Sequence, residues 1–208
     1  MLSALLPPDD TASPCLSVEQ RHSGEAQCVT DLVSHHPLDL AIRRWLDEAD
    51  VPVCFDVNLR PTVWSDPADA VGLCESVASN STIVKLSLDD AFGLFGSGVD
   101  SEAVCARILA LGAPTVVLTD GARGCWFANA TTDEIHFIPA YRVEAVEPTG
   151  AGDAFAAAII ARAIASGWKP LQREDVLFAS AAGALATTKR GAWDGLPTPD
   201  QLEAFLAQ

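Results

Sequence analysis

Apolar positions beyond residue 36 recur with the spacing of alternating helices and strands. Apolar side chains three and four positions apart predict a helix near residues 38–46. Three short, continuous apolar runs are typical of buried strands, and they cover residues 51–55, 82–86 and 115–119. Two further runs, at residues 125–128 and 135–138, flank a polar segment and predict a hairpin.

The rest of the chain is predicted to be largely helical. The segment Ser65-Asp66-Pro67 favours a helix start, because Ser or Asp can cap a helix and Pro suits its first turn. Further helices are predicted over residues 101–111, 152–166 and 174–188. A last helix begins at Thr198, where Pro199 takes the first position and Gln201 completes a capping box.

Strands that alternate with helices indicate an α/β fold with a mostly parallel sheet covered on both faces. Ligands of such sheets bind beyond the carboxyl ends of the strands, so the polar residues that follow each strand are the functional candidates. Residues 1–36 show no sustained periodicity and are interpreted as an irregular leader without strands. Residues 37–208 form the predicted domain.

Composition narrows the function classes. Lys and Arg number 13 and Asp and Glu 28, and the net charge of −15 argues against partners such as nucleic acid or an anionic membrane surface. No apolar run reaches the roughly 18 residues of a membrane span. The six cysteines form no C-x-x-C pair, which indicates free thiols in a reducing compartment. The expected location is therefore the cytoplasm.

The turn that opens the helix at residue 152 carries the strongest candidate chemistry. Gly150 and Gly152 allow a tight turn with exposed N–H groups, and the helix dipole makes this turn an anion site. Asp153 follows in the first helical turn, where a carboxylate beside a phosphate suggests a base for an attacking hydroxyl. An ordinary loop with an Asp favoured by the helix dipole explains the segment equally well on its own.

Three other polar segments follow predicted strands. In residues 119–124, two glycines permit close backbone approach and Arg123 could neutralise a phosphate, with a purely structural strand-to-turn segment as the alternative. The polar run at residues 56–60 either takes part in function or caps the next helix. In residues 85–90, Asp90 could hold hydrated Mg²⁺ through water, with a surface helix cap as the alternative.

Several other chemistries lack their motifs. The chain has no G-x-x-x-x-G-K-[ST] loop, and Gly150-x-Gly152 lacks the third glycine of a dinucleotide fingerprint. No G-x-S-x-G elbow is present for Ser-His-Asp catalysis. His35 and His36 have no partners at metal-ligand spacing, so solvated side chains are favoured over a metal site.

Taken together, three segments resemble a known family. Asp56-x-Asn-Leu-Arg60, Thr119-x-Gly-x-x-Gly124 and Thr149-Gly-Ala-Gly-Asp153, in this order, resemble the ribokinase-like (PfkB) carbohydrate kinases. The first motif and the ending at residues 187–197 look most like fructokinases. The resemblance implies a ribokinase-like three-layer fold and an enzyme that uses ATP and Mg²⁺ to phosphorylate a hexose hydroxyl.

The resemblance also implies roles for single residues. Asp153 would be the catalytic base. The anion hole for the transferred phosphoryl group would consist of Gly150, Ala151 and Gly152. The residues along the phosphates and ribose of ATP would be Thr119, Gly121, Arg123 and Gly124. Asp90 corresponds to the acidic residue that organises Mg²⁺, and Ser180 corresponds to a residue at the adenine pocket.

The chain departs from the family pattern at both ion elements. Glu147 stands where the family often has an Asp linked to potassium, which puts activation by K⁺ in doubt. Ser87 replaces the Asn of the family's Asn-x-x-Glu element, and Asp90 is one methylene shorter than the Glu.

Family members are usually longer, and the part without a counterpart here is N-terminal. That part normally supplies the first strands, a lid sheet and most sugar contacts. The sheet is then expected to have an exposed edge that can pair with a second copy or another protein. Two hypotheses follow: a kinase for a fructose-like hexose or 2-keto-3-deoxygluconate, or a truncated, catalytically weak protein that binds nucleotide or a partner.

Overall fold

The computed structural model describes residues 27–30, 44, 46, 51–60, 64, 67–132 and 134–207. The helix predicted near residues 38–46 lies almost wholly outside these residues, since only Arg44 and Leu46 are described there, both as helical. The predicted helix start at Ser65 and Asp66 also lies outside them. The predictions for the rest of the chain from residue 51 onward can be compared with the structure.

One sheet of six strands runs through the described part of the chain, and its strands are neighbours in sequence order. The strands are β1 (Gln27–Thr30), β2 (Val53–Asp56), β3 (Ile83–Ser87), β4 (Thr115–Thr119), β5 (Gly124–Asn129) and β6 (Ile135–Pro139). The first four strands are parallel, whereas β5 and β6 each run antiparallel to the strand before them. The predicted hairpin is therefore confirmed as the β5–β6 pair.

Strand β1 corrects the interpretation of residues 1–36 as a leader without strands. Gln27–Thr30 pairs in parallel with β2, from Gln27 opposite Val53 to Thr30 opposite Asp56. Four residues are too few for periodicity to identify a strand, and their pairing with a distant segment is not a local property. In the described part of the chain, β1 is therefore the edge strand, one strand beyond the first that the sequence predicts.

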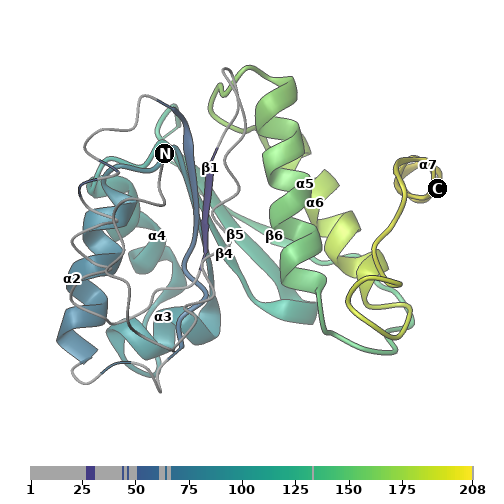
Figure 1. Ribbon diagram of the computed structural model, residues 1–208, viewed down its shortest axis with the longest axis horizontal. Helices are drawn as coiled ribbons and strands as arrows, with labels where there is room; N and C mark the ends of the chain where they lie inside the picture. Colours follow the sequence, from purple (N-terminus) through teal and green to yellow (C-terminus); the bar gives the residue numbers. More distant parts are fainter. Residues whose placement is uncertain are drawn as a thin grey trace, which may run out of the picture.

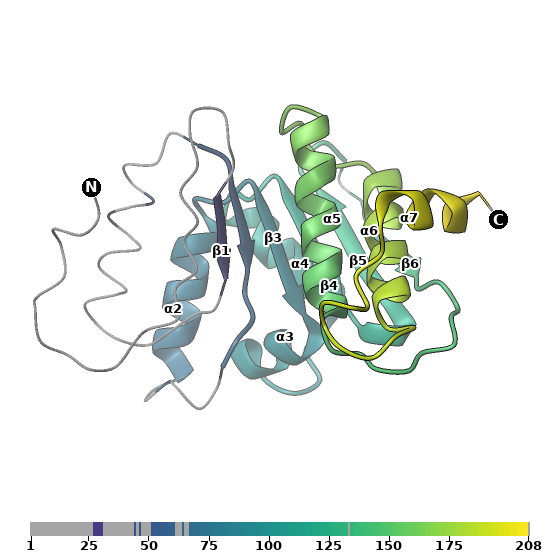
Figure 2. The same ribbon diagram turned by 45° about the vertical axis from the view of Figure 1, so that its right-hand side comes forward.

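Helices cover both faces of the sheet, as Figures 1 and 2 show. The helices are α2 (Pro67–Ala78), α3 (Leu88–Phe95), α4 (Ser101–Ala110), α5 (Ala151–Ala165), α6 (Arg173–Ala186) and α7 (Pro199–Leu206). One apolar cluster joins the sheet to α2, α3 and α4, and a second joins it to α5, α6 and α7. The predicted three-layer α/β fold is thus confirmed.

Strand alternation distributes the side chains between the two layers. In β4, Val116 and Leu118 belong to the cluster under α2, α3 and α4, whereas Val117 belongs to the cluster under α5 and α6. All three side chains are fully buried. Each such side chain contributes about 1.5–3 kcal/mol through loss of contact with water. The period-2 alternation therefore fixes which strand residues can face a site on the α5 side.

The helix start predicted at Thr198 is confirmed, whereas the helix that follows β3 was not predicted. At α7, the Thr198 hydroxyl accepts a bond from the Gln201 amide at 3.3 Å, and the Gln201 side chain accepts one from Thr198, which confirms the capping box. The short helix α3 was not predicted. Its eight residues follow β3 directly, and Ser87 both ends the strand and caps the helix, so no turn segment separates the two elements in the sequence.

Four cysteines whose side chains the structure describes are buried and form no disulfide bond. These residues are Cys54, Cys74, Cys105 and Cys125. Burial raises the pKa of Cys74, Cys105 and Cys125 to about 12, so these thiols are unreactive near neutral pH. Among the described residues, no helix is both long and apolar enough to cross a membrane.

Candidate active site

Charged side chains meet where β2 and β3 end. Asp56 closes β2 and lies opposite Lys85 in the strand register. The Lys85 ammonium donates to both carboxylate oxygens of Asp56, at 2.9 Å and 2.7 Å. Each side chain is only 7% exposed. A buried charge is costly unless paired, and the bidentate geometry supplies that pairing.

The ion pair faces the α5 side of the sheet. Cys54 and Ile83, two residues before Asp56 and Lys85, belong to the apolar cluster under α5 and α6. Since side chains two apart on a strand share a face, the pair continues this surface at the carboxyl ends of the strands. A Cβ atom at Gly152 of α5 would lie 3.7 Å from the Lys85 ammonium, so the pair sits directly below the first turn of α5.

Three carboxylates share this region. Burial raises the pKa of Asp56, the negative charges of Asp90 and Asp153 raise it further, and the Lys85 ammonium opposes the rise. The charged groups that act on Asp56 lie on β3, α3 and α5. The end of the sheet therefore concentrates negative charge around a single buried ammonium group.

Asp90 serves as a structural hydrogen-bond acceptor between three segments. Its Oδ1 accepts a bond from the Leu59 amide at 2.8 Å, and its Oδ2 accepts bonds from the amide and hydroxyl of Ser87, both at 2.7 Å. Ser87 caps α3 in return by accepting from the Asp90 amide at 3.0 Å. Asp90 is buried in a capping box, whereas the helix-cap alternative in the sequence analysis placed it on the surface.

The turn before α5 depends on its first glycine. Gly150 has a φ of +84°, in the left-handed region that favours glycine. A Cβ atom there would lie 3.1–3.2 Å from atoms of Ala192. The Ala151 amide donates to the Pro148 carbonyl at 3.2 Å and closes the turn. The structure thus places Gly150, Ala151, Gly152 and Asp153 on one helix start, with Asp153 exposed in its first turn.

The loop that follows α6 is hydrogen bonded to the segment before this turn. Glu147 accepts a bond from the Gly191 amide at 3.1 Å, and the amides of Val146 and Glu147 both donate to the Thr187 carbonyl. The Thr149 side chain and the Gly191 amide both lower the pKa of Glu147 by hydrogen bonding to its carboxylate. Glu147 therefore joins the segment before α5 to the loop that follows α6.

The glycines after β4 have a structural explanation. Gly124 has a φ of +134°, and a Cβ atom there would overlap the Ile138 carbonyl on the neighbouring strand β6. Gly121 also has a positive φ, of +52°, within the turn that joins β4 to β5. Thr119 lies opposite Ser87 in the strand register, and its hydroxyl donates to the Leu86 carbonyl at 3.4 Å. Thr119 is thus next to the end of β3.

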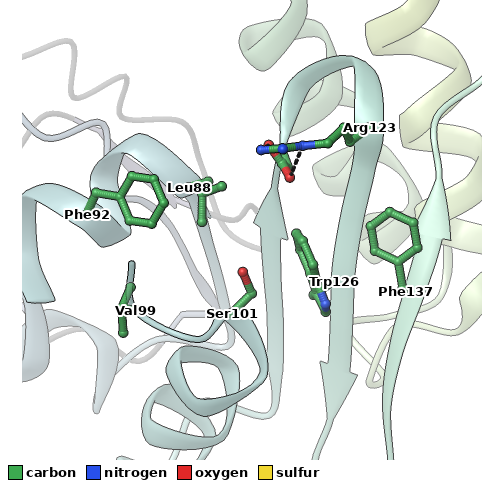
Figure 3. Close-up of a pocket in the computed structure, with 8 residues that line it drawn as sticks. Leu88, Phe92, Val99, Ser101, Arg123, Trp126 and Phe137 are labelled. Atoms are coloured by element: carbon green, nitrogen blue, oxygen red, sulfur yellow. Dashed lines mark hydrogen bonds and ion pairs between the residues drawn. The ribbon is translucent and has the colours of Figure 1, made fainter. Parts of the chain in front are cut away.

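Arg123 is held within its own turn. Its guanidinium forms an ion pair with Asp120, with Nε at 2.7 Å from Oδ2, and its side chain is 73% exposed. Figure 3 shows this ion pair at one end of an open groove of about 400 Å³, in which the Trp126 and Phe137 rings also lie. Trp126 packs with the α2–α4 cluster. The structure therefore groups Arg123 with Asp120 and with this groove.

Ser180 lies behind the turn of α5. It is buried on α6, three residues before Gly183. A Cβ atom at Gly183 would lie 3.2 Å from the Ala151 carbonyl, so α6 approaches α5 closely at this level. The side of α6 that carries Ser180 is consequently near the start of α5.

The Asp56–Lys85 pair is not predicted from the sequence. Asp56 begins the Asp56-x-Asn-Leu-Arg60 motif, and Lys85 lies within an apolar run. A lysine inside such a run is itself a signal, since lysine is almost never fully buried unless it is paired. Its partner, 29 residues away, could be identified only from the strand register.

The carboxylates at this site are suitable ligands for a Mg²⁺ ion that is also bound by the phosphates of ATP. In the described part of the chain, no group of three or more His, Cys, Asp or Glu side chains is arranged to hold a metal ion. Mg²⁺ commonly keeps several waters and binds through one or two carboxylates and the substrate phosphates. Asp153 is an exposed carboxylate of the required kind, whereas both oxygens of Asp90 already accept hydrogen bonds, so Asp90 can act on the metal only through bound water.

Comparison with known proteins places this arrangement in a family. A family model described as pfkB family carbohydrate kinase matches residues 18–199, a segment that includes β1. Aminoimidazole riboside kinase of Salmonella typhimurium is 37% identical to this chain over 166 residues, which are 79% of this chain and 51% of that protein. The chain spans about half the length of the curated relatives it matches.

Two solved structures support the same assignment. Aminoimidazole riboside kinase from Salmonella enterica, complexed with aminoimidazole riboside and an ATP analog, has a TM-score of 0.66 and 32% identity, covering 81% of this chain and 57% of that one. A double mutant of Vibrio cholerae fructokinase, bound to fructose, ADP and a potassium ion, has a TM-score of 0.74 and 29% identity, covering 91% and 62%. The chain belongs to the pfkB family of carbohydrate kinases.

Proposed function

We propose that this chain transfers the terminal phosphoryl group of ATP to a hydroxyl of a sugar, in the manner of a fructokinase in the cytoplasm. The observation that carries the proposal is the start of α5, where an exposed carboxylate follows a glycine turn. Asp153 lies in the first turn of that helix, and Lys85 lies below Gly152. A helix start of this kind favours an anionic phosphate, and the carboxylate beside it can accept a proton.

Each group then has a distinct task. Asp153 takes the proton from the attacking sugar hydroxyl. The backbone of Gly150, Ala151 and Gly152 stabilises negative charge on the phosphoryl group as it is transferred. Mg²⁺, when bound with ATP, neutralises phosphate charge, and Asp90 is the carboxylate we assign to its hydrated shell. Thr119, at the neighbouring strand end, lies where the rest of the nucleotide would extend.

Outer residues complete the proposed nucleotide site. Ser180 on α6 is assigned to the adenine pocket, and the loop bridged by Glu147 to a monovalent cation. Arg123, Gly121 and Gly124 are assigned to the ribose and phosphates of ATP. This assignment requires the Arg123–Asp120 ion pair to open when nucleotide binds, because the Arg123 guanidinium is paired with Asp120 in the present structure.

The proposed acceptor is a hexose such as fructose. A structural relative of this chain, the Vibrio cholerae fructokinase, binds fructose and ADP. The curated relative with 37% identity is a riboside kinase, which favours aminoimidazole riboside as an alternative acceptor. The sugar 2-keto-3-deoxygluconate is the third acceptor that we include.

A second candidate function is nucleotide or partner binding without turnover. The observation that favours it is length, because the chain corresponds to about half of the curated kinases it matches. Phosphoryl transfer depends on positioning and water exclusion, which need surfaces on both sides of the substrate. A partner chain would then supply the remaining surfaces.

The replacement Asp153→Ala tests the proposed role of the base. We expect turnover to fall by about 10²–10⁴-fold, because the proton acceptor is lost, while the Kd for Mg·ATP stays close to that of the parent chain. Asp200→Ala is the matched control, since Asp200 is an exposed aspartate in the first turn of α7. Near-parental turnover in Asp153→Ala would refute the role of Asp153.

A further inference from the structure

We propose that Lys85 supplies a positive charge to the phosphate site and that Asp56 is the positioning residue that holds this charge under the start of α5. The inference rests on the proposed function and deepens it, because it adds two residues from the strands to a site otherwise built from the helix and its turn. Lys85 acts on the bound phosphate, and Asp56 acts through Lys85.

Geometry places the ammonium group at the site. Lys85 is held by two hydrogen bonds, at 2.9 Å and 2.7 Å to the two oxygens of Asp56. The same ammonium would lie 3.7 Å from a Cβ atom at Gly152. An ammonium group has three N–H donors, and Asp56 takes two of them. The remaining donor is available to an acceptor at the turn.

Burial makes this charge effective. The side chains of Lys85 and Asp56 are each only 7% exposed, so solvent screens them little. A strand position with both neighbours in apolar clusters suits a Val or Ile, which would fill the space without the cost of burying two charges. Stability alone therefore gives no reason for an ion pair at this position.

The reason we propose for the ion pair is the excess of negative charge near the start of α5. Asp56, Asp90 and Asp153 are close enough for the latter two to act on the pKa of the first. A phosphate that approaches Asp153 would meet repulsion from this negative charge. The Lys85 ammonium offsets that repulsion at the point where the α5 dipole also favours an anion.

A neutral replacement of the whole pair separates charge from structure. The double variant Asp56→Asn with Lys85→Met removes both charges and leaves no unpaired buried ion. The control double variant, Glu75→Gln with Arg107→Met, removes an ion pair between α2 and α4 on the opposite face of the sheet. Titration calorimetry would measure the Kd of each chain for Mg·ATP and for adenosine, and thermal denaturation would report folding.

We expect the Asp56–Lys85 double variant to stay folded and to bind Mg·ATP at least about tenfold more weakly, with adenosine affinity unchanged. The Glu75–Arg107 control should match the parent chain with both ligands. Equal loss for Mg·ATP and adenosine, or no loss for either, would overturn the proposal.

If the variant with Asp56→Asn and Lys85→Met does not fold, a second double variant is used. It combines Asp56→Asn with Lys85→Gln, so that an amide pair can replace the ion pair. If neither neutral pair folds, the ion pair is a structural requirement and the proposal is overturned. A parent chain that binds adenosine but not Mg·ATP would overturn the phosphate site and the proposed function together. A parent chain that binds Mg·ATP without turnover would contradict only the proposed function.

Discussion

At the scale of single residues, the two glycines before Asp153 differ in what they require. Gly150 needs its lack of a side chain for two reasons, a φ of +84° and the approach of Ala192. Gly152 is helical, and the nearest atom to its Cβ position is the Lys85 ammonium at ordinary contact distance. The same sequence motif thus contains one glycine set by backbone geometry and one that faces a charge.

The variants Gly150→Ala and Gly152→Ala test this difference. We expect Gly150→Ala to lower the free energy of unfolding by about 1–3 kcal/mol, because alanine is strained at positive φ. Gly152→Ala should change it by less than about 1 kcal/mol, since alanine favours the helix. Urea denaturation of both chains gives the comparison. A Gly152→Ala chain that is the less stable of the two would contradict this account of the turn.

The Asp56 carboxyl leads to a prediction about pH. Its pKa is raised above the ordinary value of 3.8, mainly by burial. The folded chain therefore binds this proton more tightly than the unfolded chain. The contribution of Asp56 to stability is fully present below the unfolded pKa and is lost as pH rises through the raised, folded-state pKa.

The variant Asp56→Asn removes this titration. We expect the free energy of unfolding of the parent chain, relative to that of Asp56→Asn, to fall as pH rises from about 4 to about 7. Urea denaturation of both chains at several pH values measures the difference, in which the carboxylates common to both chains cancel. An increase over the same range would show that pairing with Lys85 outweighs burial.

At the scale of elements, Asp90 ties α3 to the segments on either side of it. It closes the capping box with Ser87 at the end of β3, and it accepts the Leu59 amide from the segment after β2. Both strand ends that carry the Asp56–Lys85 pair are therefore fixed by one carboxylate. This double role explains a buried acidic residue in the first turn of a short helix.

The variant Asp90→Asn should destabilise the chain by about 2–3 kcal/mol, because an amide cannot accept all three bonds and loses the charge that strengthens them. Asp89→Asn is the matched control, since Asp89 is the exposed neighbour in the same helical turn. It should cost less than about 1 kcal/mol. Thermal and urea denaturation measure both, and equal costs would refute the account of Asp90.

Sequence patterns predicted those elements whose signals are local. Residues 115–119 form a strand with the predicted bounds, and the capping box at Thr198 begins α7. Strand β1 and helix α3 were not predicted, because one depends on pairing with β2 and the other follows β3 without an intervening turn segment. The glycine turn with Asp153 was identified from sequence, whereas the Asp56–Lys85 pair required the strand register.

At the scale of the whole molecule, the fold brings the candidate residues to one end of the sheet. Parallel strands β2, β3 and β4 end together, and α5 begins above them on the face opposite α2–α4 (Figures 1 and 2). Crevices beyond the carboxyl ends of parallel strands are the usual ligand sites of such folds. Asp56, Lys85 and Asp153 meet there although 97 residues separate the first from the last.

The release of ADP by the purified chain, with Mg·ATP, K⁺ and one acceptor at a time, is the direct test of phosphoryl transfer to a sugar. The acceptors are fructose, ribose, glucose, aminoimidazole riboside and 2-keto-3-deoxygluconate. We expect release that depends on fructose, yields a phosphorylated sugar and is lost in Asp153→Ala. A chain that binds Mg·ATP yet releases no ADP with any acceptor would contradict the proposed sugar kinase and favour the nucleotide-binding alternative.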